Sequence, residues 1–339
     1  MSTDEQATHG PNFSRRQALT GALAGMAGVL LPSLASETAE AAPAPDYYFP
    51  KPESAGGWRR LVTINQTPSA AQQQAIQAKT GVIWSQLLKA YQYSRSFTPQ
   101  TSVVVIRNGW IVGEWGSTSA YPVASCSKTL TGLTMARLFD LAPSGGAYAG
   151  ITAEAPLHAL LPGSWAASDA RKRQIKIRHV LTMTSGLAPD DRPQQPNYLS
   201  VMMSKPMKTA PATEWSYVSL PIDLMSVGVQ NVTRRSIQGH FNQLVAAPLG
   251  IPPIRWGSFS GYTNASSEAW MSARDLARVG YLMLKGGAWN NGSGQRQIVS
   301  RANLGLLAQV APFTPATKFV PTPGSPFPIL FTPATKFVP

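Results

Sequence analysis

The chain has 339 residues, of which 43% are hydrophobic and only 13% are charged. This length and composition can supply a large core, so the sequence predicts a globular protein and excludes a chain that is disordered throughout. A single cysteine excludes an intrachain disulfide and a cysteine-based zinc site, and the four histidines lack metal-ligand spacing. We therefore expect no metal and no cofactor.

The net charge of +13 raises the question of an anionic partner. Positive charge clusters only in residues 171–178 (RKRQIKIR), which have no interleaved aromatic residues and no nucleic-acid-binding signature. A solvated surface is the better interpretation of this segment, so we expect no nucleic-acid partner. The charge favours acidic substrates or a polymer of the cell envelope such as peptidoglycan.

The N-terminus has the pattern of an export signal. Residues 12–19 (NFSRRQAL) contain a pair of arginines, residues 18–31 are uncharged and apolar, and residues 39–43 (AEAAP) offer a cleavage site. The apolar stretch is shorter than the roughly 20 residues of a membrane span, which disfavours a membrane anchor. Residues 1–41 are thus predicted to be a twin-arginine signal peptide, recognised by the twin-arginine translocase, and the mature protein to be periplasmic or secreted.

The mature chain begins with residues 42–68, which we interpret as an extended leader because their first part, 42–57, is rich in proline and glycine. Residues 69–93 then place apolar side chains at roughly helical spacing, and Ser69 is a favourable N-cap. This pattern predicts an amphipathic helix with an interruption near Gly81.

Residues 101–116 are rich in β-branched and aromatic side chains, with Asn108-Gly109 between two apolar runs. That pattern predicts two antiparallel strands joined by a tight turn. After Ser125 the apolar residues recur at helical spacing up to a turn at 143–146, which predicts a buried helix.

Residues 150–260 alternate short helical patterns with loops, so the middle of the chain is predicted to be mostly helix and loop. Residues 272–285 predict a further helix, which Ser272 caps and in which Asp275 completes a capping box. The apolar face of this helix, including Met283, is expected to point inward.

The last segment, 311–339, is rich in proline and contains one nonapeptide twice, FTPATKFVP at 313–321 and again at 331–339. Proline disfavours strands there. A short perfect repeat in an otherwise unrepetitive chain indicates a low-complexity tail or an artefact at the 3′ end of the gene, and we favour the artefact.

A serine and a lysine with catalytic spacing stand at the start of the predicted buried helix. Ser125 and Lys128 lie three residues apart, so their side chains share one face of the helix. A serine hydroxyl is a poor nucleophile until a base takes its proton, and a lysine amine can do so. Taken alone, the same spacing also fits a helix cap followed by a surface lysine.

Other segments supply context for this pair. Residues 178–187 (RHVLTMTSGL) resemble the HLLTMTSGL stretch of the class C β-lactamase-like serine hydrolases, a family that includes penicillin-binding proteins, esterases and small-amide hydrolases. Residues 211–219 (PATEWSYVS) are similar to the PGxxWxYSN element of that family. Later matches lie in segments 270–278, 286–289 and 297–300. The resemblance covers about residues 75–303.

The resemblance implies an α/β (α+β) fold within residues 69–310, in which helices flank a mostly antiparallel sheet and an all-helical subdomain is inserted. It further implies that Ser125 is the acylated nucleophile, Lys128 its proton acceptor, and Tyr217 the acid and base for the leaving group and for deacylation. Ser219 stands where the family often has asparagine, and could hydrogen-bond a substrate carbonyl or Lys128. This difference disfavours efficient β-lactamase activity.

Three other groups are less suitable for catalysis. His179 has no recognisable acidic partner for a serine–histidine triad and is expected to be structural. Cys126 follows Ser125 but points about 100° away on a helix, so we expect it to be packed. Residues 79–81 spell KTG, the third motif of the family, but precede the nucleophile and sit in a helical stretch, so we regard them as a decoy.

The resemblance also implies a KTG or HxG strand after Tyr217, and the sequence contains none. We therefore expect the C-terminal strands to be truncated and the site to be weakened, because such a strand would donate a second oxyanion hydrogen bond. Two hypotheses remain. The chain is an exported serine hydrolase acting on an ester, an amide or a β-lactam, with esters and simple amides preferred, or it is an impaired relative of the same fold that binds peptidoglycan or has no function.

Overall fold

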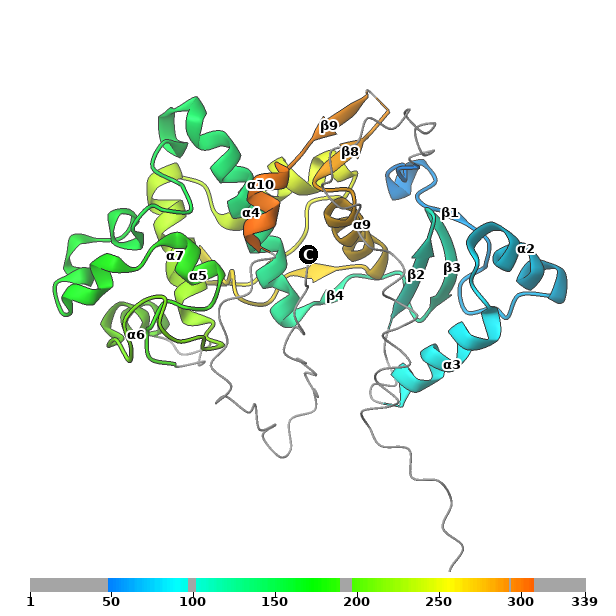
Figure 1. Cartoon of the computed structure of the whole chain (residues 1–339), viewed down its shortest axis with the longest axis horizontal. Helices are drawn as coiled ribbons and strands as arrows, with labels where there is room; N and C mark the ends of the chain where they lie inside the picture. Colours follow the sequence, from blue (N-terminus) through cyan, green and yellow to red (C-terminus); the bar gives the residue numbers. More distant parts are fainter. Residues whose placement is uncertain (1–47, 97–101, 190–196, 293, 308–339) are drawn as a thin grey trace, which may run out of the picture. The chain divides into compact units, whose positions relative to one another are not determined.

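A computed structural model describes residues 48–96, 102–189, 197–292 and 294–307. Every described residue belongs to one compact unit, Tyr47–Ala334. Its α-helices are α2 (Ala70–Thr80), α3 (Trp84–Arg95), α4 (Ser127–Leu141), α5 (Ile177–Leu181), α6 (Tyr198–Ser204), α7 (Leu220–Thr233), α8 (Ile237–Phe241), α9 (Ala273–Leu284) and α10 (Arg301–Leu307) (Figure 1). Its strands are β1 (Arg59–Arg60), β2 (Val103–Arg107), β3 (Trp110–Trp115), β4 (Tyr121–Pro122), β5 (Ser258–Phe259), β6 (Tyr262–Thr263), β7 (Trp270–Met271), β8 (Ala288–Asn290) and β9 (Gln295–Gln297).

The largest sheet of the described chain has three strands in the order β1-β3-β2. The predicted hairpin is confirmed: β2 pairs antiparallel with β3, and both Asn108 (φ 51°) and Gly109 (φ 76°) have positive φ, as a tight hairpin turn requires. The third strand, β1, comes from the predicted leader and pairs in parallel with β3, with Arg59 opposite Trp110. The sequence pattern did not predict β1, because two residues are too short to show a period.

Two helices follow the first strand and pack near this sheet. Ser69 and Gln72 form a reciprocal capping box at the start of α2, and Gly81 ends it in the left-handed conformation (φ 73°). The predicted helix over 69–93 is therefore two helices, α2 and α3, with the break at the predicted glycine. Ile76 is the buried apolar residue of α2.

Helix α4 is the centre of the larger core. It is buried on most of its circumference, and even its hydroxyl residues Thr131 and Thr134 are inaccessible. The predicted inward residues are confirmed, since each is fully buried: Leu130, Leu133, Ala136 and Leu138. Helix α10 contacts α4 (Figure 1), and Leu307 packs against the position of Gly132. A helix surrounded in this way gives the residues at its N-terminus a rigid base.

The middle of the described chain, between β4 and β5, consists of helices and loops with isolated bridges, as predicted. This mixture of helices and small sheets agrees with the predicted α/β (α+β) class. Helix α9 begins at its predicted cap, where Ser272 Oγ accepts the Asp275 N–H at 3.1 Å. Met283 of α9 is 38% exposed, so its predicted inward direction is wrong.

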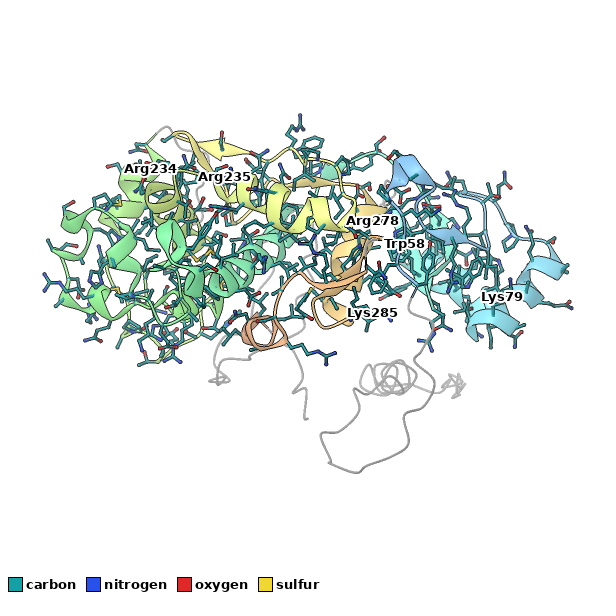
Figure 2. All side chains as sticks on the ribbon, turned by 90° about the horizontal axis from the view of Figure 1, so that it is seen from above. Trp58, Lys79, Arg234, Arg235, Arg278 and Lys285 are labelled. Atoms are coloured by element: carbon teal, nitrogen blue, oxygen red, sulfur yellow. The ribbon has the colours of Figure 1, made fainter. Side chains whose placement is uncertain are left out.

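The predicted leader is tied into the structure by charge. Arg274 of α9 bonds Glu53 of the leader and Glu114 of β3. Arg278 is fully buried, bonds Glu53 at 2.8 Å, and lies with its guanidinium 5.7 Å from the ring of Trp58 (Figure 2). These ion pairs join three segments that are distant in sequence, so the leader is part of the packed structure.

We expect Glu114→Gln to destabilise the protein by about 3 kcal/mol, because breaking a buried ion pair leaves an uncompensated charge. Glu114 is 4% exposed and accepts two hydrogen bonds from Arg274, and an amide would turn an N–H donor toward one of the guanidinium donors. Urea unfolding of the wild type and the variant measures this difference in the free energy of unfolding.

The matched control for that substitution is Glu154→Gln, which breaks exposed pairs with Lys176 and Arg178. The side chain of Glu154 is 59% exposed, so this loss should stay within about 1 kcal/mol. Equal losses in the two variants would contradict the role given to the buried network.

A buried histidine makes the stability of the fold depend on pH. His240 of α8 is inaccessible, its Nε2 shares a hydrogen bond of 2.9 Å with Thr233 Oγ1, and its ring meets the edge of Tyr148. Burial, and secondarily the charge of Arg235, lowers the pKa of His240 to about 4. Between about pH 6.5 and pH 4, His240 therefore takes up a proton in the unfolded chain but not in the folded chain.

Below about pH 6.5 the unfolded chain protonates His240, whereas the folded chain does so only near pH 4, so stability should fall across this interval. The expected loss attributable to this side chain is about 3 kcal/mol. Urea unfolding of the wild type and of His240→Gln between pH 7 and pH 4 isolates the contribution of His240. The contributions of the buried Asp223 and Asp275 are the same in both proteins and cancel in the difference between their free energies of unfolding. Parallel pH profiles for the two proteins would contradict the assignment.

Several predictions fall on residues that are not described. The signal peptide (1–41) and the repeated tail (311–339) both lie outside the described residues. The proposed absence of C-terminal strands therefore stays a prediction. Among the described residues, no helix combines the length and the apolar character needed to cross a membrane.

Candidate active site

Ser125 lies in a short 3₁₀ turn, Ala124–Cys126, that runs directly into α4. Its side chain is half-buried, and it lies next to the N-terminal end of the helix that follows, which carries the positive end of the helix dipole. Lys128 Nζ, one turn along, donates a hydrogen bond of 3.2 Å to Ser125 Oγ. The predicted serine and lysine are therefore in contact, on the face that their spacing implies.

The backbone just before the serine is held in an unusual conformation. Ala124 has a φ of +43°, which is costly for a residue with a Cβ. Ser127 Oγ donates to Ala124 O at 2.6 Å and accepts the Ala269 N–H at 3.0 Å. Val123 N–H donates in turn to Ala269 O at 2.8 Å. The start of α4 is thus clamped to residue 269, and these bonds hold the strained turn that presents Ser125.

Lys128 makes contacts to three elements. Besides Ser125, its Nζ donates to Ser266 O at 2.9 Å and stands 4.9 Å from the centre of the Tyr217 ring. A cation at this distance from an aromatic ring is attracted by the ring's electron-rich face. The structure therefore brings Tyr217, from a distant part of the sequence, to the pair formed by Ser125 and Lys128.

The segment that carries Tyr217 rests on the segment that matched the HLLTMTSGL stretch. Ser216 N–H donates to Met183 O and Ala212 N–H donates to Thr184 O, each at 2.9 Å. These two backbone bonds fix the residue immediately before Tyr217. This stretch thus has a physical role here, which is to support the segment that places the Tyr217 ring beside Lys128 of α4.

The backbone at Gly186, in the segment RHVLTMTSGL, has no room for a side chain. Its φ is +75°, and a Cβ at this position would lie 2.4 Å from Thr209 O. Gly186 O also accepts the Lys208 N–H at 2.8 Å. Any larger residue at position 186 would therefore displace the backbone at Thr209, which belongs to the segment that leads to Tyr217.

Ser219, the fourth predicted site residue, is the N-cap residue of α7. It is half-buried, and its carbonyl accepts the N–H groups of Ile222 and Asp223 at 3.0 and 3.3 Å. The structure thus places Ser219 at the first turn of the helix that follows Tyr217.

One acidic residue near the site was not predicted. Asp223 of α7 is fully buried, and it accepts hydrogen bonds of 2.9 Å from Tyr198 Oη, Ser266 Oγ and Ser266 N–H. Burial raises the pKa of Asp223 to about 6, while its hydrogen bonds and the charge of Lys128 act in the opposite direction. A carboxylate within the apolar run LPIDLM was a signal that could have identified it.

Other candidate catalytic or metal-binding groups have different surroundings. His179 Nδ1 accepts the Lys176 N–H at 3.2 Å at the start of α5, and burial lowers the pKa of this histidine. The expectation that Cys126 is packed is wrong, because its side chain is exposed. Residues 79–81 end α2, as their interpretation as a decoy requires. Among the described residues, no group of three His, Cys, Asp or Glu side chains could hold a metal ion.

Solved structures identify the fold of this chain. A protein assigned as a β-lactamase from Bacteroides dorei DSM 17855 superposes with a TM-score of 0.53 and 19% identity, covering 68% of this chain and 72% of its own. A protein assigned as a 6-aminohexanoate-dimer hydrolase from Bacillus anthracis gives a TM-score of 0.51 and 16% identity, over 62% of this chain and 60% of its own. The chain thus has the β-lactamase/transpeptidase-like fold.

The family model described as Beta-lactamase matches residues 86–327. This range is most of the chain and contains Ser125, Lys128 and Tyr217, so the protein belongs to the β-lactamase family, whose members are serine hydrolases. No curated protein matches the sequence.

Proposed function

We propose that this protein is an exported serine hydrolase that cleaves an ester or an amide through a covalent acyl-enzyme on Ser125. The observation that carries the proposal is the position of Lys128 Nζ, 3.2 Å from Ser125 Oγ and 4.9 Å from the centre of the Tyr217 ring. A nucleophile and a proton acceptor are therefore in contact, and the ring of a second acid–base residue lies beside the acceptor, an arrangement that suits covalent catalysis. Membership of a family of serine hydrolases supports the same chemistry.

In the first half-reaction, Ser125 Oγ attacks the carbonyl carbon of the substrate while its proton passes to the amine of Lys128. The positive end of the α4 dipole, at the start of the helix, stabilises the negative charge that develops on the substrate oxygen. When the tetrahedral intermediate collapses, the bond to the leaving alcohol or amine breaks and the leaving group takes a proton from the Tyr217 phenol. The product is an ester of Ser125.

In the second half-reaction, water attacks this ester. The Tyr217 phenolate removes a proton from the water, and the Lys128 ammonium returns a proton to Ser125 Oγ as the acyl group leaves. The carboxylic acid is released and each group regains its starting protonation state. Between the two half-reactions Lys128 and Tyr217 carry opposite charges, which attract each other.

A fluorophosphonate probe tests the proposal, because Ser125 Oγ would displace fluoride from phosphorus and retain the phosphonyl group. We expect intact-protein mass spectrometry to show one adduct per chain, and peptide mapping to place it on Ser125. The Ser125→Ala variant, which removes only one oxygen, is expected to remain unmodified. A folded wild-type protein without an adduct, or an adduct on another residue, would support the alternative of a non-catalytic relative.

For the substrate, we propose esters and simple amides in preference to β-lactams. The support is Ser219, which stands where the family element has asparagine and offers one hydroxyl in place of an amide. A weaker hold on a substrate carbonyl suits small acyl groups better than β-lactam antibiotics. We expect faster turnover of a p-nitrophenyl ester than of a chromogenic cephalosporin, and the reverse order would refute this preference.

For the location, we propose export by the twin-arginine route to the periplasm or the exterior, where peptidoglycan-type substrates are available. The support is the pair Arg15 and Arg16 before the apolar run. We expect replacement of both arginines by lysine to leave the unprocessed precursor inside the cell. Immunoblots of cell fractions would show this, with Lys51→Arg in the mature chain as the control. Export that survives the replacement would contradict the route.

A further inference from the structure

Asp223 has no role in the two half-reactions above, yet a single residue, Ser266, connects it by hydrogen bonds to Lys128. It is inaccessible to solvent, although a buried carboxylate is costly unless its hydrogen bonds compensate. Two of its three hydrogen bonds go to one residue, Ser266, through the backbone N–H and the side-chain hydroxyl. Ser266 is the residue whose carbonyl accepts the hydrogen bond from Lys128.

The loop around Ser266 is fixed from several directions. Ser267 N–H donates to Asn264 O at 3.1 Å, which sets the orientation of the peptide group that carries the Ser266 carbonyl. Trp256 Nε1 donates to the carbonyls of Asn264 and Ser267, at 2.8 and 2.7 Å. On the side of α4, Thr131 Oγ1 donates to Ala265 O at 2.7 Å. These hydrogen bonds together hold the Ser266 carbonyl in the orientation in which it faces Lys128.

Resting on the proposed function, we propose that Asp223 is a positioning residue: by holding Ser266 through two hydrogen bonds, it aims the Ser266 carbonyl at Lys128 and so keeps the lysine amine in place beside Ser125. The path consists of Asp223 Oδ1 and Oδ2, the Ser266 N–H and Oγ, the Ser266 carbonyl and Lys128 Nζ. Every bond along it is 2.9 Å long.

This position matters because Lys128 changes its charge during the reaction. When the amine takes the proton of Ser125 it becomes an ammonium, and the Ser266 carbonyl accepts one of its N–H bonds. An acceptor fixed beforehand does not have to reorganise at that moment. Asp223 and Lys128 also interact through their charges, because the charge of Lys128 lowers the pKa of Asp223. The titratable groups facing Asp223 in the described chain are Tyr198 of α6 and Lys128 of α4, and Lys128 in turn contacts the ring of Tyr217.

The Asp223→Asn variant separates this role from simple folding. Its amide keeps the shape of the carboxylate but has one acceptor oxygen, so it cannot serve both donors of Ser266. We expect fluorophosphonate labelling of Ser125 to slow by about 10- to 100-fold, because a small misplacement of a catalytic group has effects of this size. The matched control is Tyr198→Phe, which removes the third hydrogen bond to Asp223 and leaves both bonds to Ser266. Its labelling rate should change by no more than about 3-fold.

A second measurement does not depend on labelling of Ser125. Competitive acetylation with acetic anhydride, read by mass spectrometry at a series of pH values, reports when the Lys128 amine loses its proton. We expect the midpoint for Lys128 to lie about one pH unit lower in Asp223→Asn than in the wild type, since a neighbouring negative charge is lost. Tyr198→Phe should keep the wild-type midpoint, and urea unfolding should show that both variants fold.

The two measurements give distinct outcomes. If Ser125 of the wild type is not labelled but the Lys128 midpoint moves as expected, the proposed function fails and the link between Asp223 and Lys128 stands. If Ser125 is labelled and both variants slow it equally with the same Lys128 midpoint, Asp223 is only structural and the inference is overturned. An unchanged midpoint in Asp223→Asn overturns it whether or not labelling occurs.

Discussion

Replacing Lys128 by methionine is expected to slow fluorophosphonate labelling of Ser125 by about 10³-fold. Methionine resembles the lysine stem in length but has no amine, so the Ser125 proton loses its acceptor, and removal of a general base has effects of 10²- to 10⁴-fold. The half-buried site should tolerate the apolar side chain, so the protein is expected to fold. Labelling rates at one probe concentration, followed by intact-protein mass, measure the effect.

Two further variants identify what the lysine supplies. Lys128→Arg keeps the positive charge but cannot act as a base, since a guanidinium does not lose its proton at ordinary pH. It should therefore be as slow as the methionine variant if Lys128 accepts the proton. Lys89→Met, on the exposed side of α3, is the matched control and should label at the wild-type rate. Labelling of Lys128→Met within about 3-fold of the wild type would contradict the assignment.

Tyr217→Phe is expected to separate the two half-reactions. A p-nitrophenyl ester has a leaving group that departs without a proton, so acylation of Ser125 should continue in this variant. Deacylation requires a base for the attacking water, and its rate should fall by about 10²- to 10⁴-fold. The prediction is one equivalent of p-nitrophenolate released in a burst, followed by slow turnover, with the acyl group detectable on Ser125 by mass.

The control for this experiment is Tyr91→Phe, which removes the hydroxyl of a tyrosine stacked on Trp115 near the sheet. It should show the turnover of the wild type. If Tyr217→Phe also turns over at the wild-type rate, the phenol is not the base for deacylation. If the variant shows neither burst nor turnover, Tyr217 acts in acylation as well, and the division of labour proposed above would need revision.

Part of the fold could be predicted from the sequence because its cause is local. The turn at Asn108-Gly109 follows from the ease with which these residues adopt positive φ. The end of α2 at Gly81 and the cap of α9 at Ser272 likewise depend on neighbours within a few residues. The buried character of α4 was visible because apolar side chains occupy its predicted inner face.

Other parts of the fold depend on distant segments. The pairing of β1 with β3 joins Arg59 to Trp110, and two residues carry no readable period. Arg278 is a charged residue with no exposed surface, and its burial is possible because Glu53, far away in the sequence, bonds it. Met283 was expected to point inward because it continues an apolar face, but nothing in the described structure covers it fully.

The candidate site divides in the same way. By itself the sequence determined the pair Ser125 and Lys128, because their contact follows from the geometry of one helical turn. Only the tertiary structure decided that Tyr217 stands 4.9 Å from the lysine amine, and that Asp223 reaches the same amine through Ser266. The physical reason is that these contacts join α4, α7 and the loop before β7, and the positions of such elements are set by the packing of the whole core rather than by residues near them in sequence.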